Sequence, residues 1–326
     1  MSNKYKIIKY CNELGLDTIG ITSCRKFKEL EELFQLRKNK GYENEFEEKN
    51  IDKRINPKIY MEGGKAIISI AFPYMFNNEF DSKFYFSKYT MGKDYHLVIS
   101  NYLKKICMFI ESLGGEAKYF VDSNFLPERH IASLSGIGFI GKNNMIITKK
   151  YGSYVFLGEI ITNLELEEDK PVEYGCGNCS LCLQECPTGS IKGNFNNPNI
   201  CLSYITQKKD LEDVWLSKLN GRIFGCDSCQ KICPYNKKVN CSSIKEFIPL
   251  PFMENADIGE LINLDNKTFK EKYANTSCGW RGKNILTRNA LINAFKEGEF
   301  ENIVIKQFNS PYVKDYYGRL LRLHKL

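Results

Sequence analysis

The sequence lacks long apolar runs, and this excludes several classes of protein at the outset. No hydrophobic stretch in the 326 residues reaches the length of about 20 residues that a bilayer-spanning helix needs. The first residues lead directly into an amphipathic pattern, without the apolar segment of a signal peptide. We therefore expect a cytoplasmic protein with no membrane partner.

Histidine is also scarce, and the usual phosphate-binding motifs are missing. His96 is one of three histidines, a candidate base or metal ligand, although a single histidine after a tyrosine is more often structural. No segment has the spacing of a P-loop or of a G-x-G-x-x-G turn after a strand. The net charge of +7 is compatible with a polyanionic partner, but equally with a solvated basic surface.

Cysteine, in contrast, is abundant, with 13 residues. Thiols stay reduced in the cytoplasm, so clustered cysteines there indicate metal binding. Four of the cysteines are scattered along the chain and are expected to be small buried hydrophobic residues: Cys11, Cys24, Cys107 and Cys278.

Eight other cysteines form two blocks with one residue between them. The first block has the spacing of a bacterial ferredoxin, C-x2-C-x2-C-x3-C-P, and consists of Cys176, Cys179, Cys182 and Cys186. The second block is one cysteine shorter and consists of Cys226, Cys229 and Cys233. Cys201 lies between the blocks. Thiolates at these spacings bind 4Fe–4S clusters, which store and pass electrons.

The spacing also predicts which cysteine binds which cluster. In ferredoxins the cysteine before the proline ligates the other cluster. The first cluster therefore receives Cys176, Cys179, Cys182 and Cys233. The second receives Cys186, Cys226 and Cys229, and its fourth ligand is expected to be Cys201, with Cys241 as the alternative.

Zinc is the other metal that cysteine pairs of this kind bind. Zinc ribbons rarely need C-x2-C-x2-C followed by x3-C-P, so we prefer two 4Fe–4S clusters over two zinc sites. Disulfides are a further alternative that the expected reducing compartment disfavours.

Hydrophobic periodicity predicts helices and strands mixed along the chain. Helices are expected at 4–15, 26–40, 97–113, 128–135, 257–263, 266–274 and 288–296. Strands are expected at 16–22, 66–72, 117–121, 145–148 and 154–161. The last two are predicted to pair through a turn at residues 151–152. The fold class is therefore α+β.

We predict three domains. An acidic segment at 165–171 marks a linker between the first two. Residues 1–170 form a catalytic domain, residues 171–245 a ferredoxin-like module with both clusters, and residues 246–326 a helical C-terminal region.

Asp122 is the main candidate for proton transfer. It ends a predicted strand, where a carboxyl group can face a cleft. In a site closed by a bulky cofactor, desolvation would raise its pKa and allow it to deliver a proton; an aspartate that caps a turn is the alternative. Three glycines at 136–141 permit close approach of a large ligand, or simply a tight turn. Arg54 precedes a turn at Pro57 and is a further candidate; a charge on the protein surface is the alternative.

Together these motifs resemble the epoxyqueuosine reductase family, which contains cobalamin-dependent iron–sulfur enzymes. The similar segments run from about residue 5 to 295 in the family's order. They include 87–96 (SKYTMGKDYH), 121–123 (VDS), 136–143 (GIGFIGKN), 152–153 (GS), 157–159 (LGE), 176–189, 201–204 (CLSY) and 225–236 (GCDSCQKICPYN). Residues 286–292 (LTRNALI) resemble the start of the family's HEAT-like repeat.

The resemblance implies an N-terminal α/β cobalamin-binding domain, the inserted two-cluster module and a short HEAT-like tail. Family members reduce epoxyqueuosine to queuosine at the wobble position of tRNA anticodons. The implied partners are a tRNA anticodon stem-loop, to which the basic excess would bind, and a low-potential electron donor. We expect a monomer.

The resemblance also implies a mechanism and its residues. Electrons would pass through both clusters to cobalamin, Co(I) would attack the epoxide carbon, and Asp122 aligns with the family's proton donor. The implied cobalamin contacts are Arg54, Asp122, Ile147, Thr148, Leu157, Gly158 and Ser203.

Two other interpretations remain: a cobalamin and iron–sulfur reductase of a small molecule, and a plain electron carrier. Dehalogenases of the first kind typically begin with a twin-arginine segment, which this sequence lacks, and a carrier would need no proton donor. The chain also departs from the family pattern. Phe125 replaces a usual proline, Asn144 a usual threonine, and the C-terminal region is shorter, which leaves the tRNA-binding surface in question.

Overall fold

The fold is described from a computed structural model, which describes residues 1–76, 82–122, 125–193, 195–303 and 308–323. Chain contacts divide it into two compact units, each built from three separate segments. Unit 1 contains Met1–Met75, Tyr95–Asn199 and Cys229–Lys245, and unit 2 contains Phe76–Asp94, Ile200–Ser228 and Glu246–Leu326. The domain boundaries predicted after residues 170 and 245 stay a prediction, because a compact unit need not fold by itself.

Unit 1 is built on a four-stranded antiparallel sheet with the strand order β1-β2-β7-β4. The strands are β1 (Ile19–Ser23), β2 (Ala66–Pro73), β7 (Val155–Thr162) and β4 (Ala117–Phe120). Every residue of β2 is buried. Such a continuous apolar strand requires that both faces of the sheet be covered.

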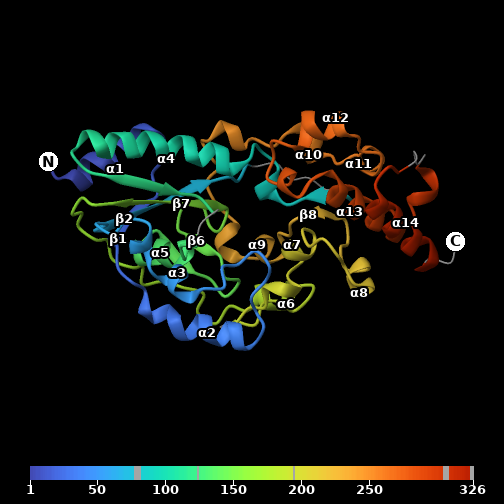
Figure 1. Ribbon diagram of the computed structural model, residues 1–326, viewed down its shortest axis with the longest axis horizontal. Helices are drawn as coiled ribbons and strands as arrows, with labels where there is room; N and C mark the ends of the chain where they lie inside the picture. Colours follow the sequence, from blue (N-terminus) through green and yellow to red (C-terminus); the bar gives the residue numbers. More distant parts are fainter. Residues whose placement is uncertain (77–81, 123–124, 194, 304–307, 324–326) are drawn as a thin grey trace. The chain divides into compact units, whose positions relative to one another are not determined.

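Helices cover both faces of this sheet (Figure 1). On one face lie α1 (Asn3–Glu13) and α4 (Tyr95–Ser112), joined by the stacked rings of Tyr10 and Phe109 at 4.3 Å. On the other face lie α2 (Glu31–Asn39), α3 (Ile51–Ile55) and α5 (Glu128–Leu134). The periodicity predicted helices in all of these segments except α3.

The predicted pairing of 145–148 with 154–161 is wrong. Instead, β6 (Ile146–Thr148) pairs antiparallel with β5 (Gly138–Ile140), and β7 pairs with β2 and β4. Both edges of β7 are therefore occupied within the large sheet. Gly138 permits the close approach of β5 to β6, because a Cβ atom there would lie 2.3 Å from the carbonyl oxygen of Ile147.

A buried polar network fixes residues 230–236, which include Cys233 of the second cysteine block, within unit 1. The Asn236 side chain accepts from the Ser153 backbone N–H at 2.8 Å and donates to the Ser153 hydroxyl at 2.9 Å. Gln230 donates to the Ser153 carbonyl and to the Tyr74 hydroxyl. Because Tyr74 and Ser153 flank β2 and β7, these bonds connect residues 230–236 to the end of the sheet.

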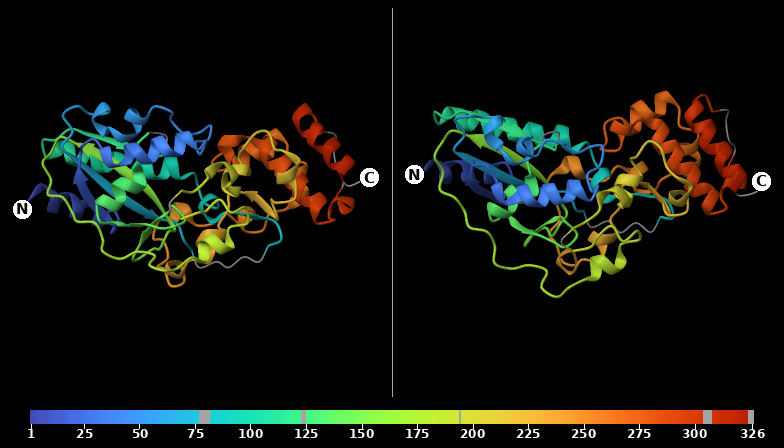
Figure 2. Two further views of the ribbon diagram at one scale, coloured as in Figure 1. Left: turned by 90° about the horizontal axis from the view of Figure 1, so that it is seen from below. Right: turned by 60° about the horizontal axis from the view of Figure 1, so that its bottom comes forward.

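Unit 2 has a small parallel pair, β3 (Tyr85–Phe86) with β8 (Arg222–Phe224), packed among helices. These helices include α7 (Leu202–Ile205), α8 (Asp213–Leu216), α10 (Pro251–Glu254), α11 (Ile258–Ile262), α12 (Asn266–Thr268), α13 (Lys283–Lys296) and α14 (Pro311–Leu323). The last two lie side by side (Figure 2). Their assignment as a HEAT-like repeat stays a prediction.

Helix α13 is buried on all sides and carries polar residues into the core of unit 2. Asn289 donates to the carbonyls of Thr206 and Ile223, at 2.8 and 2.7 Å. Asn293 donates to the carbonyl of Arg222 at 3.0 Å. Buried carbonyls need such partners, so α13 holds β8 and the loop before it in place.

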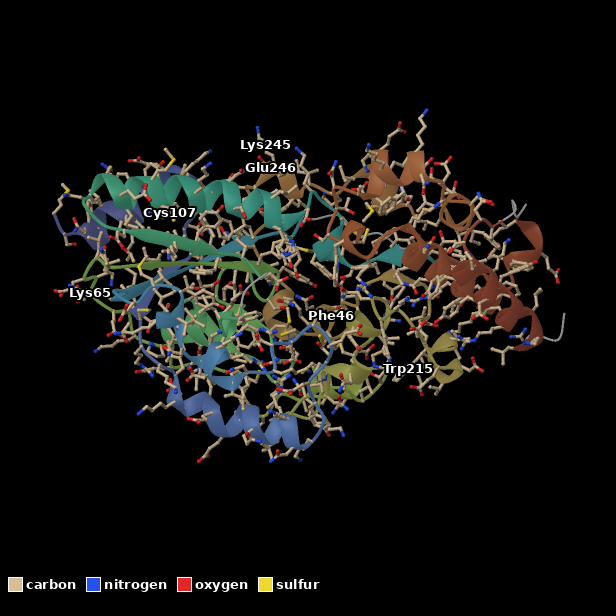
Figure 3. All side chains as sticks on the ribbon, viewed as in Figure 1. Phe46, Lys65, Cys107, Trp215, Lys245 and Glu246 are labelled. Atoms are coloured by element: carbon tan, nitrogen blue, oxygen red, sulfur yellow. The ribbon has the colours of Figure 1, made fainter. Side chains whose placement is uncertain are left out.

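The four scattered cysteines are buried, as predicted. Burial raises the pKa of Cys24 to about 11 and that of Cys11, Cys107 and Cys278 to about 12. Figure 3 shows Cys107 on α4. These thiols stay protonated at neutral pH and act as small hydrophobic side chains.

Candidate functional site

Asp122 lies just after β4, with its side chain 59% exposed. Its backbone φ of 47° lies in the left-handed region that few residues other than glycine adopt. The Glu128 carboxylate accepts the Asp122 backbone N–H at 2.8 Å. This bond fixes the backbone so that the carboxyl group remains open to a ligand. Ser123, the last residue of the VDS motif, lies outside the described residues.

Two side chains from the start of α4 face the Asp122 carboxyl group. The Tyr95 hydroxyl donates to its Oδ2 atom, and Nε2 of His96 lies 3.4 Å from the same oxygen. The Tyr95 ring is stacked on Phe156 of β7 at 4.3 Å and on His96 at 4.1 Å. Stacking on both faces fixes the hydroxyl in place, so the structure brings together a carboxylate, a phenol and an imidazole.

The surroundings hold the pKa of Asp122 below its ordinary value. Desolvation by the neighbouring protein raises this pKa, but hydrogen bonds from His96 and Tyr95, with the positive charges of His96 and Arg129, lower it by more. The first turn of α4 also favours an anion nearby through the helix dipole. In the free protein the carboxyl group is therefore ionised at neutral pH.

The first predicted group of cluster ligands comes together in unit 1. Burial raises the pKa of Cys182, and the thiolates of Cys176, Cys233 and Cys179 raise it further. Cys233 also packs with Phe139 and Ile147 in an apolar cluster that Cys176 adjoins. Charges influence one another in this way only at short range, so these four thiols, drawn from both blocks, are neighbours.

Lys142 anchors the loop that carries this group. Its Nζ atom donates to the carbonyl of Gly177 at 2.8 Å and to that of Cys179 at 2.9 Å. The lysine follows the glycines at 136–141, and these pack against the chain itself. A Cβ atom on Gly136 would lie 2.4 Å from the carbonyl of Lys170, for example. The tight-turn alternative thus accounts for this glycine.

The remaining cysteines of the blocks are partly exposed thiols. In unit 1, burial raises the pKa of Cys186, but backbone N–H groups of Thr188 and its neighbours lower it by more, so the pKa lies below its ordinary value. In unit 2, Cys201 precedes α7, and Cys226 follows β8. Cys229 lies in α9 (Ser228–Lys231), and Cys241 is exposed.

The donor set fits iron–sulfur clusters. None of the 13 cysteines, all of which lie in described residues, forms a disulfide. In the part of the chain that the structure describes, no three or more His, Cys, Asp or Glu side chains gather closely enough to bind a single metal ion. Thiolates are the ligands of 4Fe–4S clusters, so the chemistry of these cysteines suits a cluster.

The residues expected at cobalamin lie in several elements. Arg54 is in α3, and its guanidinium pairs with Glu47 at 3.1 Å and Glu43 at 3.5 Å, over the ring of Phe34. Burial lowers the pKa of Arg54. The interpretation of Arg54 as a solvated surface charge is therefore wrong; carboxylates that follow α2 hold this arginine.

Among the other expected contacts, the side chains of Ile147, Thr148 and Leu157 are buried, whereas Ser203 is half-buried. Ile147 and Thr148 lie in β6, and Leu157 and Gly158 lie in β7. A Cβ atom on Gly158 would come within 2.9 Å of side chains on α4. In unit 2, the Ser203 carbonyl accepts from the Gln207 side chain at 2.8 Å. A bound cofactor would therefore meet β6 and β7 mainly through backbone atoms.

Several polar groups of unit 1 were not singled out by the sequence. The Asn143 amide nitrogen and the Glu159 Oε2 atom are buried without a hydrogen-bond partner among the described residues. A buried amide donor without a partner costs about 1–3 kcal/mol, so Asn143 suits an acceptor on a bound group. Asn143 and Tyr95 both lie in segments that resemble the epoxyqueuosine reductase family, and this resemblance was the only feature of the sequence that indicated a role for them.

Comparison with known proteins gives two family matches. The 4Fe-4S double cluster binding domain matches residues 175–236, which include both cysteine blocks. The family described as "Epoxyqueuosine reductase QueG, DUF1730" matches residues 54–123, which include Asp122. An epoxyqueuosine reductase from Lactococcus garvieae is 39% identical over 300 residues, which cover 89% of this chain and 86% of the relative. The chain belongs to the epoxyqueuosine reductase family.

Solved structures of epoxyqueuosine reductases have the same fold. One, bound to an epoxyqueuosine-modified stem loop of tyrosine tRNA, is 33% identical with a TM-score of 0.90, covering 98% of this chain and 93% of that one. Another, from Bacillus subtilis, is 32% identical with a TM-score of 0.88 and the same coverage, and its aspartate catalytic loop is swung out of the active site. Among the described residues, no helix is long and apolar enough to cross a membrane.

Proposed function

We propose that this chain reduces epoxyqueuosine to queuosine at the wobble position of tRNA, as a cytoplasmic monomer. The observation that carries this proposal is the extent of the family relationship. It covers 89% of the chain at 39% identity and includes both Asp122 and the cysteine blocks. An enzyme with this chemistry needs both an electron path and a proton donor.

The electron path consists of two 4Fe–4S clusters. The first is bound by Cys176, Cys179, Cys182 and Cys233, and the proximity of these thiols in unit 1 supports the assignment. The second is bound by Cys186, Cys201, Cys226 and Cys229. Lys142, at the carbonyls beside the first group, offsets part of the negative charge that thiolate ligands bring. A low-potential donor supplies the electrons.

Cobalamin, when bound, supplies a strongly nucleophilic reduced cobalt for opening the epoxide. Backbone atoms around Ile147–Thr148 and Leu157–Gly158 are the proposed contacts, together with Arg54, Asp122 and Ser203. The unpartnered Asn143 amide supports a ligand-binding role for the loop before β6. The pairing of Arg54 with Glu43 and Glu47 makes it a rigid contact rather than a mobile charge.

Asp122 protonates the oxygen that the opened epoxide releases. The free carboxyl group is ionised, so the proton must come onto it during binding or turnover. A nucleoside that covers the exposed side chain removes water from it, and desolvation raises the pKa of a carboxyl group. Tyr95 and His96 face the same oxygen of Asp122 and orient the protonated carboxyl group. They are also close enough to return a proton to Asp122 after it has donated one.

The tRNA partner accounts for the basic excess of the chain. Lys and Arg exceed Asp and Glu by 46 to 39, which favours contact with phosphates. A base that projects from its loop can reach buried chemistry. The related structure with a modified tRNA stem loop supports a stem-loop as the minimal substrate.

One experiment tests the proposed function. Anaerobically reconstituted protein is incubated with tRNA that contains epoxyqueuosine, with cobalamin and a strong reductant, and the nucleosides are analysed by mass spectrometry. We expect queuosine to form, and to require both cobalamin and reductant. Full conversion without cobalamin, or none with every component and about eight irons bound, would contradict the proposal.

A further inference from the structure

A buried arginine contacts one of the proposed cluster ligands in unit 2. Arg222, in β8, is 6% exposed. Its Nε–H donates to the Sγ atom of Cys226 at 3.3 Å. One Nη atom donates to the Ser228 hydroxyl at 2.8 Å, and that hydroxyl lies 3.6 Å from the same sulfur. In the free thiol, the Cys226 S–H donates to this hydroxyl. A cysteine that ligates a cluster has no proton, so its sulfur can only accept, and the guanidinium N–H and the Ser228 O–H are then both within reach of it.

The position of the guanidinium is rigidly determined. Its second Nη atom donates to the carbonyls of Leu219 and Asn220, at 3.1 and 3.3 Å. The Cζ atom of Arg222 lies 5.6 Å from the ring centre of Tyr85, on the neighbouring strand β3. The backbone beneath it is held by Asn293 of α13. The direct contact with Cys226 is thus built into the fold of unit 2.

The positive charge of this arginine is not neutralised locally. Its partners are two carbonyls, one hydroxyl, one sulfur and an aromatic ring, and no carboxylate pairs with it among the described residues. The nearby Asp227 carboxylate accepts instead from the Ser87 hydroxyl and the Lys88 backbone N–H. A buried cation without a counter-ion is costly unless an anion binds beside it.

We propose that Arg222, with the Ser228 hydroxyl that it holds, raises the reduction potential of the cluster bound by Cys226. The inference rests on the proposed assignment of Cys226 as a ligand. When the cluster accepts one electron from a low-potential donor, its net charge becomes more negative by one, and no bond breaks. An adjacent positive charge stabilises the reduced form more than the oxidised form. Hydrogen bonds to ligand sulfur act in the same direction.

This role makes Arg222 a positioning and tuning residue and not a catalytic one, since it touches a ligand sulfur but neither substrate nor cobalt. It also distinguishes the second cluster from the first. At the first group, Lys142 donates to backbone carbonyls, whereas Arg222 donates directly to a sulfur.

The test is a redox titration of the reconstituted full chain, followed by electron paramagnetic resonance. Arg222→Met removes the charge and both donors to Cys226 and Ser228, while Ser228→Ala removes only the hydroxyl. Arg281→Met is the control, because the Arg281 Nε–H donates to a backbone carbonyl, that of Gln207, and not to the sulfur of a proposed cluster ligand. Iron content and far-UV circular dichroism establish which variants are folded and loaded.

We expect the wild type to show two one-electron waves, one per cluster. In Arg222→Met one wave moves to lower potential, so that the ratio of reduced to oxidised cluster at a fixed ambient potential falls at least about tenfold, or about 59 mV for a one-electron couple. Ser228→Ala moves the same wave in the same direction by less. The other wave, and both waves of Arg281→Met, stay in place.

Unchanged waves in Arg222→Met and Ser228→Ala would overturn the proposal. If Arg222→Met fails to fold, Ser228→Ala decides alone, because loss of a small hydroxyl leaves the guanidinium's other contacts. A wild type with a single cluster would overturn both the tuning role and the assignment of the second cluster. Two clusters with unshifted waves would overturn the tuning role alone.

Discussion

Replacement of Glu159 tests whether the buried sheet of unit 1 contains a neutral carboxyl group. This carboxyl group lies in β7 with 0% exposure, and its Oε1 atom accepts from the Ser69 hydroxyl at 3.2 Å. Its Oε2 atom has no hydrogen-bond partner among the described residues. Burial raises the pKa of Glu159 well above its ordinary value, and the charge of Glu128 raises it further. The folded protein therefore holds a neutral carboxyl group at this position.

The stability of the protein should depend on pH through this group. In the unfolded chain a glutamate loses its proton near about pH 4.3. Above that pH, and up to the raised pKa, only the folded state keeps the proton, so the free energy of unfolding falls by about 1.4 kcal/mol per pH unit. Glu159→Gln preserves the shape and an acceptor for Ser69, but it has no proton to lose. The free energy of unfolding of the variant, relative to that of the wild type, should therefore rise by about 1.4 kcal/mol per pH unit over this range.

The assay is urea unfolding followed by far-UV circular dichroism at about pH 5, 6 and 7, with linear extrapolation. Both tryptophans, Trp215 and Trp280, lie in unit 2, so their fluorescence does not report on this sheet directly. Figure 3 labels Trp215. Glu165→Gln is the control, because Glu165 is 83% exposed and Lys65 lowers its pKa. If the free energies of unfolding of wild type and Glu159→Gln changed with pH in parallel, the carboxyl group of Glu159 would not be neutral in the folded protein.

Three further predictions concern the cluster ligands, the core of unit 2 and Asp122. Cys201→Ser should lower the iron content from about eight to about four, whereas Cys241→Ser should leave it unchanged; the reverse pattern would make Cys241 the ligand. Asn289→Leu should lower the free energy of unfolding of unit 2 by about 2–4 kcal/mol, because two buried carbonyls lose a donor. Urea unfolding followed by tryptophan fluorescence measures this change, and a decrease below about 0.5 kcal/mol would contradict the prediction. Tyr95→Phe keeps the ring stacking but removes a hydrogen bond that lowers the pKa of Asp122. The limb of the pH–rate profile that reports the ionisation of Asp122 should therefore move to higher pH. An unmoved limb would show that Tyr95 does not set the pKa of the proton donor.

Local spacing carried most of what the sequence could predict. The spacing of the cysteine blocks was enough to predict 4Fe–4S clusters, because the cluster itself sets the spacing of its ligands along the chain. The assignment of Cys233 to the first cluster stays a prediction, which the influence of Cys233 on the pKa of Cys182 supports. The scattered cysteines were correctly predicted to be buried, since small apolar residues within periodic segments seldom face water.

Contacts between distant segments were where prediction from sequence failed. The partner of β6 is β5 and not β7, because β7 already has β2 and β4 on its two edges, and a local turn signal contains no information about them. A surface charge was the alternative for Arg54, and the sequence could not exclude it because no motif marks the carboxylates that pair with this arginine. Glu159 has a polar side chain in a strand of apolar residues, and only the three-dimensional sheet shows that it is buried.

The most direct test of the account compares wild type with Asp122→Asn at equal iron and cobalamin content. Each protein is incubated anaerobically with excess reductant and tRNA that contains epoxyqueuosine, and the nucleosides are measured over time. The account predicts queuosine from the wild type and none from Asp122→Asn, with unchanged cluster and cobalamin spectra in the variant. Equal rates of queuosine formation by the two proteins would contradict the assignment of Asp122 as the proton donor.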